Sequence, residues 1–125
     1  LASTVSPYRL KMRRLLDEEE RLANVLMARK PLLKGTVYQM KTKCGKEGCK
    51  CQREGELHTA WRISRSHKGS VYARYLKKEG DILRGKQLTE NYRRFRRARA
   101  ELIKIHREQI KLVNLLEKGR REKDF

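Results

Sequence analysis

Apolar residues near the N-terminus recur at the spacing of a helix. Their intervals of four, three, seven and four residues place five of them on one helical face, at Tyr8, Met12, Leu15, Leu22 and Leu26. Ser6 offers an N-cap, and Pro7 suits the first helical position because its missing N–H is not needed there. Pro31 cannot continue a helix. The pattern therefore predicts a helix over residues 6–30.

The segment 32–78 has the composition of strands and turns rather than of a helix. Its β-prone runs are Thr36–Met40, Ala60–Ser64 and Ser70–Leu76. Between the last two, Ser66–Gly69 has the composition of a hairpin turn. The segment predicts a three-stranded antiparallel sheet, with a cysteine-containing loop between the first strand and the hairpin.

A second long helix is predicted over residues 81–118, with an interruption near Gly85 and a frayed tail over 119–125. At 100° per residue, a mostly apolar seam falls within about 60° of Leu102. It consists of Leu88, Phe95, Ala98, Leu102, Ile105, His106, Val113 and Leu116. The opposite side carries Arg93, Arg96, Arg97, Lys104, Arg107, Lys111 and Lys118. The first six of these seven cations are called the basic ridge below.

Each predicted helix has one apolar face that needs a partner, and the sheet between them allows the chain to return. The expected fold class is therefore α+β. Two long helices form an antiparallel helical hairpin, and a small three-stranded antiparallel sheet that carries the cysteine loop lies between them in sequence. Residues 1–125 are expected to form a single domain. A homodimer through the same apolar faces is the alternative.

The charge of the chain points to an anionic partner. Among 125 residues, 33 Lys and Arg stand against 15 Asp and Glu, for a formal net charge of +18. Such an excess repels itself in a compact protein, and nucleic acid is the commonest partner that neutralises it. No run approaches the ~20 apolar residues of a membrane span, and Leu1–Arg14 lacks the apolar core of a secretory signal. We expect a cytoplasmic protein with no membrane partner.

Three cysteines and a histidine follow one another in the pattern C-x4-C-x-C-x6-H. The four residues are Cys44, Cys49, Cys51 and His58. An odd number of closely spaced cysteines is a poor disulfide framework, whereas four sulfur and imidazole ligands meet the tetrahedral preference of zinc. Lys43, Lys46 and Lys50 flank the cysteines and offset the negative charge of their thiolates. The pattern predicts a structural zinc site.

Several alternatives to this zinc site stay open. The cysteines can be reduced and free of metal, although free cysteines favour apolar settings rather than a Gly- and Lys-rich loop. An iron–sulfur centre usually takes four cysteines. His67 can replace His58, while His106 is expected to be a satisfied core histidine. A catalytic zinc needs an open position and a general base, and the deaminase, Walker and G-x-S-x-G patterns are absent. We therefore expect no enzymatic activity.

The cysteine segment and its surroundings resemble a small uncharacterised family of bacterial and archaeal proteins. The resemblance rests on Leu32–Tyr38, Lys43–Lys46, Cys49–Cys51, His58 and Asn91–Phe95, and it covers about residues 32–102. Members carry a K-C-G-K-x-x-C-x-C core and are often encoded near transposases. Where the family has H-G-P-Y, this chain has His58-Thr59-Ala60-Trp61. The resemblance implies a cysteine-rich, nucleic-acid-associated module linked to mobile elements.

The expected nucleic-acid contacts come from the loop, the sheet and the basic ridge. They are Lys43, Lys46, Lys50, Arg62, Arg65, Arg74, Arg93, Arg96, Arg97, Lys104, Arg107 and Lys111. Four aromatic residues interleave with the sheet cations and can stack on unpaired bases. Of these, Trp61 and Tyr38 are expected in the core, and at most one of Tyr72 and Tyr75.

The leading hypothesis is a non-enzymatic, zinc-stabilised protein that binds DNA or RNA through its phosphates. The alternative is a helical-hairpin adaptor that docks an acidic protein, such as a recombinase or nuclease subunit. A metal-dependent nuclease ranks third, because the basic segments lack the clustered carboxylates that such a site needs.

Overall fold

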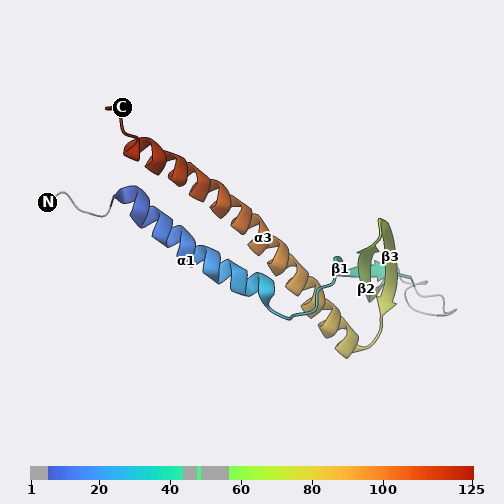
Figure 1. Cartoon of the computed structure of the whole chain (residues 1–125). Coiled ribbons are helices and arrows are strands. Elements are labelled where there is room, and N and C mark those ends of the chain that lie inside the picture. Colours follow the sequence, from blue (N-terminus) through green and yellow to red (C-terminus); the bar gives the residue numbers. More distant parts are fainter. Residues whose placement is uncertain (1–5, 44–47, 49–56) are drawn as a thin grey trace. The chain divides into compact units, whose positions relative to one another are not determined.

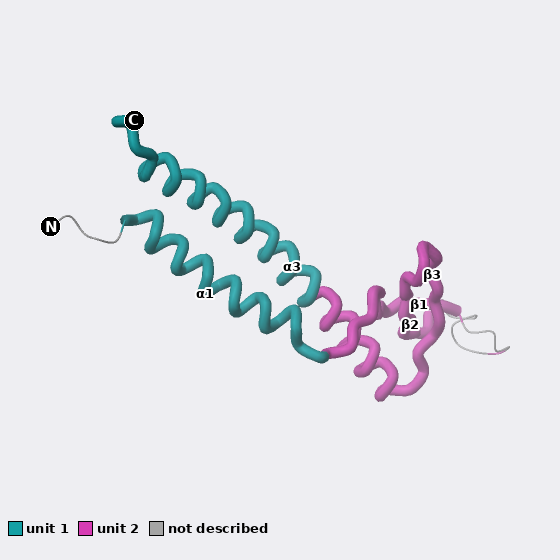
Figure 2. The backbone as a smooth tube through the Cα atoms, in the orientation of Figure 1, with its two compact units in different colours: residues 1–29, 94–125 teal, residues 30–93 magenta. Residues whose placement is uncertain are grey.

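The computed structural model describes residues 6–43, 48 and 57–125 of the chain. Its elements are helix α1 (Pro7–Met27), strands β1 (Gly35–Thr42), β2 (His58–His67) and β3 (Ser70–Leu76), and helix α3 (Glu79–Arg120) (Figure 1). The predicted α+β class, with two helices and a three-stranded antiparallel sheet between them in sequence, is confirmed. The chain forms two compact units, residues 1–29 with 94–125 and residues 30–93, which are described separately (Figure 2).

Helix α1 begins where its capping residues predict. The Ser6 hydroxyl accepts a hydrogen bond from the Arg9 N–H at 3.2 Å, and Pro7 occupies the first turn. The helix ends at Met27 rather than at residue 30, and Ala28 is already extended. The segment that follows makes other hydrogen bonds: the Leu33 N–H donates to the Leu88 carbonyl at 3.1 Å. The end of α1 is therefore set by what the next segment binds and not by Pro31 alone.

The three strands follow one another in the sheet in chain order. Strand β2 is central and pairs antiparallel with β1 and with β3. The register places Ile63 opposite Val37 on one side and opposite Arg74 on the other. Between β2 and β3, Lys68 and Gly69 have φ values of 49° and 80°. Two positive φ values in a two-residue loop define a type I′ turn, which matches the twist of a β-hairpin.

The sheet packs against the first part of α3 inside unit 2. Helix α3 runs through Gly85 without a break, so the predicted interruption there is wrong. A Cβ at Gly85 would lie 3.0 Å from Val37 Cγ2 and 3.2 Å from Ile63 Cδ1. Gly85 is thus a position where the helix backbone approaches the sheet closely, which offsets the loss of helix propensity that a glycine brings.

The core of unit 1 lies between α1 and the later part of α3. Leu22, Ala98 and Ile105 are almost fully buried, and four half-buried residues pack on them, namely Leu15, Val25, Leu26 and Leu102. Three polar contacts join the same two helices: Arg21 with Glu101, Glu19 with His106, and Lys11 with Glu108. Partners later in α1 lie earlier in α3, so the two helices run in opposite directions in this unit (Figure 1).

The predicted seam of α3 is wrong near its C-terminal end. Leu112 is buried, whereas Val113 is 49% exposed and His106 is on the surface in contact with Glu19. The buried positions Ala98, Ile105 and Leu112 repeat every seven residues. Helices that keep a seven-residue contact drift by about 20° per heptad from a straight helix at 100° per residue. A projection anchored at Leu102 therefore misplaces the last two turns.

Candidate nucleic-acid interface

Three cations of the basic ridge are exposed in unit 1 and have no carboxylate partner among the described residues. Arg96, Lys104 and Arg107 are exposed. None of the three forms an ion pair with a carboxylate in the part of the chain that the structure describes. Arg96 and Arg107 each stand two residues from a buried seam position, Ala98 and Ile105, which is about 200° around the helix. The core therefore holds α3 in place while these cations face solvent.

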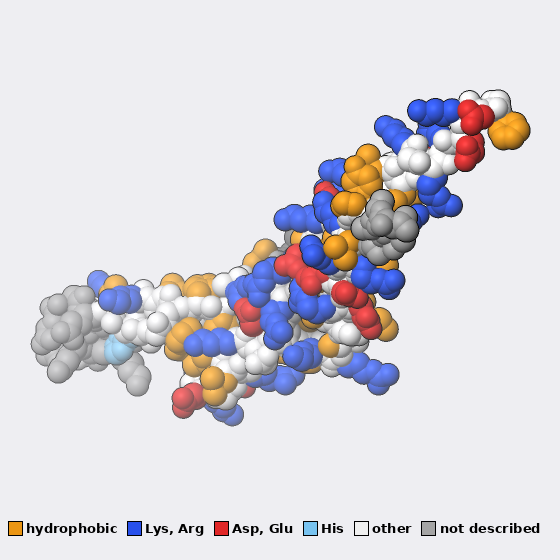
Figure 3. Space-filling view, turned by 90° about the vertical axis from the view of Figure 1, so that its left-hand side faces the viewer, with side chains coloured by type: hydrophobic (Ala, Val, Ile, Leu, Met, Phe, Trp, Pro, Cys, Tyr) orange, Lys and Arg blue, Asp and Glu red, His pale blue; other side chains and the backbone are white. Residues whose placement is uncertain are grey.

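Two other cations of the basic ridge are paired with carboxylates and so are less available for phosphate contacts than predicted. Lys111 pairs with Glu108 at 3.4 Å, and in unit 2 Arg93 pairs with Glu90 at 3.5 Å. The hydrogen bond from Lys111, with the charges of Lys111 and Lys11, holds the pKa of Glu108 below its usual value. Carboxylates thus stand among the cations, and acidic and basic side chains are mixed over the visible face (Figure 3). The basic ridge therefore has acidic side chains among its cations.

Arg97 does not lie on the side of α3 opposite the core. It lines a small hollow of unit 1 beside the seam, together with Leu22, Val25, Ala98, Arg21, Arg94 and Glu101. Arg21 is already engaged there by Glu18 and Glu101, and its hydrogen bonds hold the pKa of Glu18 below the usual value. Arg94 was missing from the predicted contacts, although it belongs to the same Asn91–Phe95 run as Arg93.

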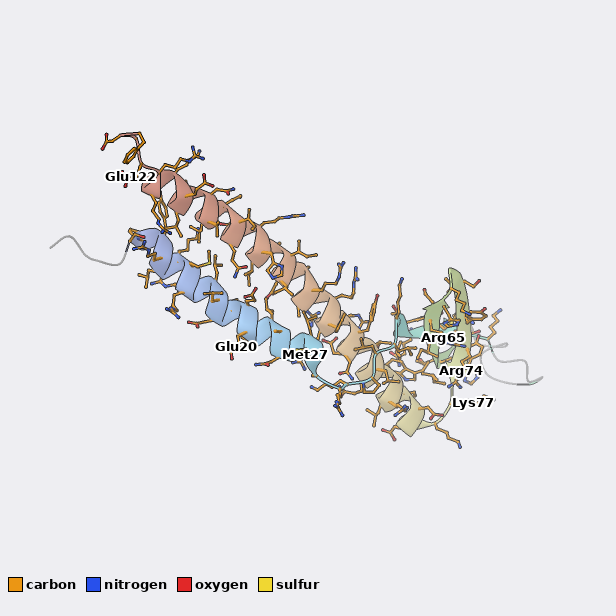
Figure 4. The ribbon with its side chains drawn as sticks, in the orientation of Figure 1. Glu20, Met27, Arg65, Arg74, Lys77 and Glu122 are labelled. Atoms are coloured by element: carbon orange, nitrogen blue, oxygen red, sulfur yellow. The ribbon has the colours of Figure 1, made fainter. Side chains whose placement is uncertain are left out.

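The predicted contacts of the sheet lie in unit 2. Arg65 and Arg74 are exposed on β2 and β3, and Figure 4 labels them with Lys77, which follows β3 directly. Arg62 is half-buried on β2, and Lys43 is exposed just after β1. Lys46 and Lys50 lie outside the described residues. The exposed Arg65 and Arg74 share one face of the sheet with Ile63, while the half-buried Arg62 lies on the other face.

The four aromatic residues of the sheet divide between its two faces. Trp61 is half-buried on the face that packs on α3, and Lys86 Nζ lies 4.2 Å from the centre of its ring. Tyr38 alternates with Val37 and so lies on the opposite face, which means that its predicted place in the core beside α3 is wrong. Tyr72 and Tyr75 are 50% and 46% exposed, and neither is a core residue. The need to bury Val37 and Ile63 against Gly85 fixes this division.

The predicted zinc ligands fall mostly outside the described residues. Of the four, only His58 is described; it begins β2 and pairs across the sheet with Thr42, the last residue of β1. No group of three potential metal ligands occurs within residues 6–43, 48 and 57–125, and Cys44, Cys49 and Cys51 are not among these. His67, the alternative ligand, ends β2 nine residues away from His58, about 30 Å along the strand.

The Asn91–Phe95 run has a structural role at its first residue. Asn91 is buried, and its Nδ2 donates to the Pro31 carbonyl at 3.0 Å while its Oδ1 accepts from Gln87 at 2.8 Å. Asn91 thus fastens the segment between α1 and β1 to α3 within unit 2. Because its side chain is buried and hydrogen-bonded within the fold, Asn91 is not one of the candidate nucleic-acid contacts.

Replacing Asn91 by alanine should lower the free energy of unfolding by about 1–3 kcal/mol, because two part-buried hydrogen bonds of Asn91, to the Pro31 carbonyl and from the Gln87 amide, are lost. Urea unfolding followed by circular dichroism would measure the loss. The matched control is Asn114→Ala, an exposed asparagine on the same helix, which should change stability by less than about 0.5 kcal/mol. Equal effects of the two substitutions would contradict the role given to Asn91.

The fold and surface define a small basic α+β protein with exposed arginines on a long helix and on a sheet. Residues 10–85 match the family described as a domain of unknown function, DUF6788, and the chain belongs to that family. The predicted membership of an uncharacterised family is confirmed, whereas the cysteine motif and the link to transposases stay predictions. No curated protein and no solved structure matches the chain. Among the described residues, neither helix has the length and apolar character that a membrane crossing requires.

Proposed function

We propose that this protein is a non-enzymatic, zinc-stabilised nucleic-acid-binding protein associated with mobile elements. The observation that carries the proposal is the group of Arg96, Lys104 and Arg107. These residues are exposed, form no ion pair with a described carboxylate, and stand on a helix that is packed on α1 through Leu22, Ala98 and Ile105. Phosphate groups are the anions that such a row of fixed cations fits best.

In this proposal the two helices form an antiparallel hairpin that presents the exposed cations of α3 to a nucleic-acid backbone. Arg65 and Arg74 of the sheet supply further phosphate contacts. Contacts with phosphates fix the position of a protein on nucleic acid but do not read its sequence. Binding should therefore be weakly sequence-specific and should depend strongly on salt.

The salt dependence of binding tests this proposal. With about four phosphates neutralised, affinity for a labelled 25-base-pair duplex should fall about 100-fold between 50 and 200 mM salt, because counterions are released on binding. Fluorescence anisotropy at several salt concentrations gives the slope of log Kd against log salt. Absence of binding to both duplex and single strands at 50 mM salt would contradict the proposal, as would a Kd that salt does not change.

The proposed function includes a zinc ion with a structural role. The ends of the loop over residues 43–57 are brought together because β1 and β2 pair through Thr42 and His58. In this proposal Cys44, Cys49 and Cys51, which lie between these two paired residues in sequence, bind zinc together with His58. Zinc at such a site supplies folding energy rather than catalysis. Three closely spaced cysteines that bind a metal, rather than form disulfides, also suit a reducing cytoplasm.

A protein adaptor is the second candidate, and a patch on α3 favours it. Ile110 is 61% exposed, and together with Ile103 it forms a shallow apolar surface bordered by Arg107 and Lys111. An apolar strip with basic borders suits an acidic amphipathic helix of a partner such as a recombinase or nuclease subunit. A complex that survives nuclease treatment and 500 mM salt would favour this candidate over nucleic-acid binding.

A further inference from the structure

Three side chains form one row across the whole sheet. The register pairs Tyr38 of β1 with Arg62 of β2, and Arg62 with Tyr75 of β3. Directly paired residues point to the same face of an antiparallel sheet, so the three side chains share a face. They are called the Tyr–Arg–Tyr row below.

The Tyr–Arg–Tyr row lies on the face of the sheet that α3 does not contact at Gly85 or Lys86. Those two helix residues meet Val37, Ile63, Leu76 and Trp61, all on the other face. On the face of the row, Tyr75 is 46% exposed and Val71 is 70% exposed. The row is thus a polar and aromatic surface of unit 2 with solvent access at β3.

The neighbours of the row on β2 and β3 are small, while Thr36 and Met40 flank Tyr38 on β1. The residues two positions away from Arg62 and from Tyr75 along their strands are small: Ala60, Ser64 and Ala73. Because residues i and i+2 of a strand share a face, these small side chains flank the row directly. Larger side chains at Ala60, Ser64 and Ala73 would block the approach of a flat ligand to Arg62 and Tyr75.

Arg62 gives the row an unused hydrogen-bond donor. Its guanidinium carbon lies 4.8 Å from the centre of the Tyr75 ring, within the range of a cation–π contact. Its Nε is buried and has no acceptor among the described residues. A buried donor without an acceptor is costly in free energy. Because this Nε is covered, an incoming oxygen atom reaches it only when the Arg62 side chain moves.

We infer that the Tyr–Arg–Tyr row binds an unpaired strand of nucleic acid; the inference rests on the proposed function and names the form of nucleic acid that the protein prefers. Bases of the strand stack on Tyr38 and Tyr75, and Arg62 donates to an oxygen of a base edge or of the backbone. The two tyrosines stand two strand spacings apart, about 10 Å, so each ring can take its own base.

Both the charge of the protein and the chemistry of stacking favour an unpaired nucleic-acid strand as the ligand of the row. Aromatic rings accept any unpaired base, whereas the bases of a duplex have both faces covered by their neighbours. A polyanionic strand is complementary to a chain of net charge +18, and a second copy of this chain on the same face would bring like charges together. An unpaired strand therefore fits both the rings and the charge.

The test compares single strands with a duplex on the full chain. Kd is measured by fluorescence anisotropy for a 15-nucleotide oligopyrimidine as DNA and as RNA, and for the DNA duplex of the same sequence. Tyr75→Ala should weaken single-strand binding about 10-fold and leave duplex binding unchanged, because one stacked base is lost. Tyr75→Phe keeps the ring and should restore single-strand affinity. The inference is supported if the wild type binds single-stranded DNA or single-stranded RNA more tightly than the duplex. The tighter of the two single strands is then the preferred one.

The matched control is Tyr72→Ala. Tyr72 is exposed to a similar extent and also stacks with an arginine, Arg65 at 5.2 Å, but it lies on the other face of the sheet. Tyr72→Ala should leave the single-strand Kd unchanged, and circular dichroism confirms that both variants fold. Equal losses from the two substitutions, or no loss from Tyr75→Ala, would overturn the inference while salt-dependent duplex binding upholds the proposed function. Absence of binding to every probe would overturn both.

Discussion

Replacement of Arg96 and Arg107 by glutamate should weaken binding of a 25-base-pair duplex at least about 100-fold at 50 mM salt. Each substitution removes a phosphate contact and adds a repulsive charge, so the slope of log Kd against log salt should fall by about two. Both side chains are exposed and form no ion pair with a described carboxylate. The fold should therefore keep its stability, which thermal unfolding measures.

The control for this charge reversal is Arg13→Glu with Arg14→Glu on α1. Both residues are exposed, and the double variant has the same net charge as the variant of α3. A specific contact surface on α3 predicts a large loss for Arg96 and Arg107 and a loss of less than about 10-fold for the control, which changes only the general field of the protein. Equal losses of affinity in the two double variants would show that only the net charge of the protein matters and that α3 carries no specific contact surface.

Arg97 is a poorer choice for this experiment than its neighbours. It lines the hollow beside Leu22 and Glu101, so a carboxylate there would disturb the contact between the helices as well as any phosphate contact. A loss of binding in an Arg97→Glu variant could therefore come from a change in the fold or from the loss of a phosphate contact, and binding alone would not tell which. Arg107 avoids this because it stands on the far side of α3 from Ile105.

Replacement of Cys49 by serine should abolish zinc binding and unfold the sheet-containing unit in part. Wild-type protein purified without chelator should carry about one zinc ion per chain by elemental analysis, and the variant almost none, because a hydroxyl is a weak ligand for zinc. Since metal binding at a structural site is folding energy, amide hydrogens of β1 and β2 should lose protection from exchange.

The matched pair for the zinc site is His58→Asn and His67→Asn. His58 stands at the base of the cysteine-containing loop, and His67 stands at the other end of β2 beside the turn. The first substitution should reduce zinc content and the second should leave it unchanged. Zinc-free wild-type protein whose stability does not respond to a chelator would contradict the site, and loss of zinc in His67→Asn alone would assign the fourth ligand to His67.

Local signals in the sequence were enough to predict where α1 begins and where the β2–β3 hairpin turns. Ser6 and Pro7 act through the backbone of the next three residues, and Lys68–Gly69 acts through its own two φ angles. Such effects need no distant partner, so a pattern of neighbouring residues predicts them. The three strands and two helices follow from the same kind of signal.

The candidate interface was only partly predictable. The exposed arginines of α3 follow from helical periodicity, and Arg96, Lys104 and Arg107 were all anticipated. The pairing of Lys111 with Glu108 is a local i,i+3 contact on α3 that the sequence analysis overlooked. The place of Arg97 beside the core depends on contacts with α1, which no projection of a single helix contains. The Tyr–Arg–Tyr row depends on strand register, which Val37 and Ile63 fix by packing against Gly85.

The sequence by itself determined the α+β class of this protein, the beginning of its first helix, its hairpin and its strongly basic character. Only the tertiary structure decided that Leu112 and not Val113 enters the core, that Gly85 serves close packing, and that Tyr38 lies away from α3. The physical reason is the range of the forces involved. Capping and turn geometry act over a few residues, whereas seam and register are chosen by the burial of apolar surface between segments far apart in the chain.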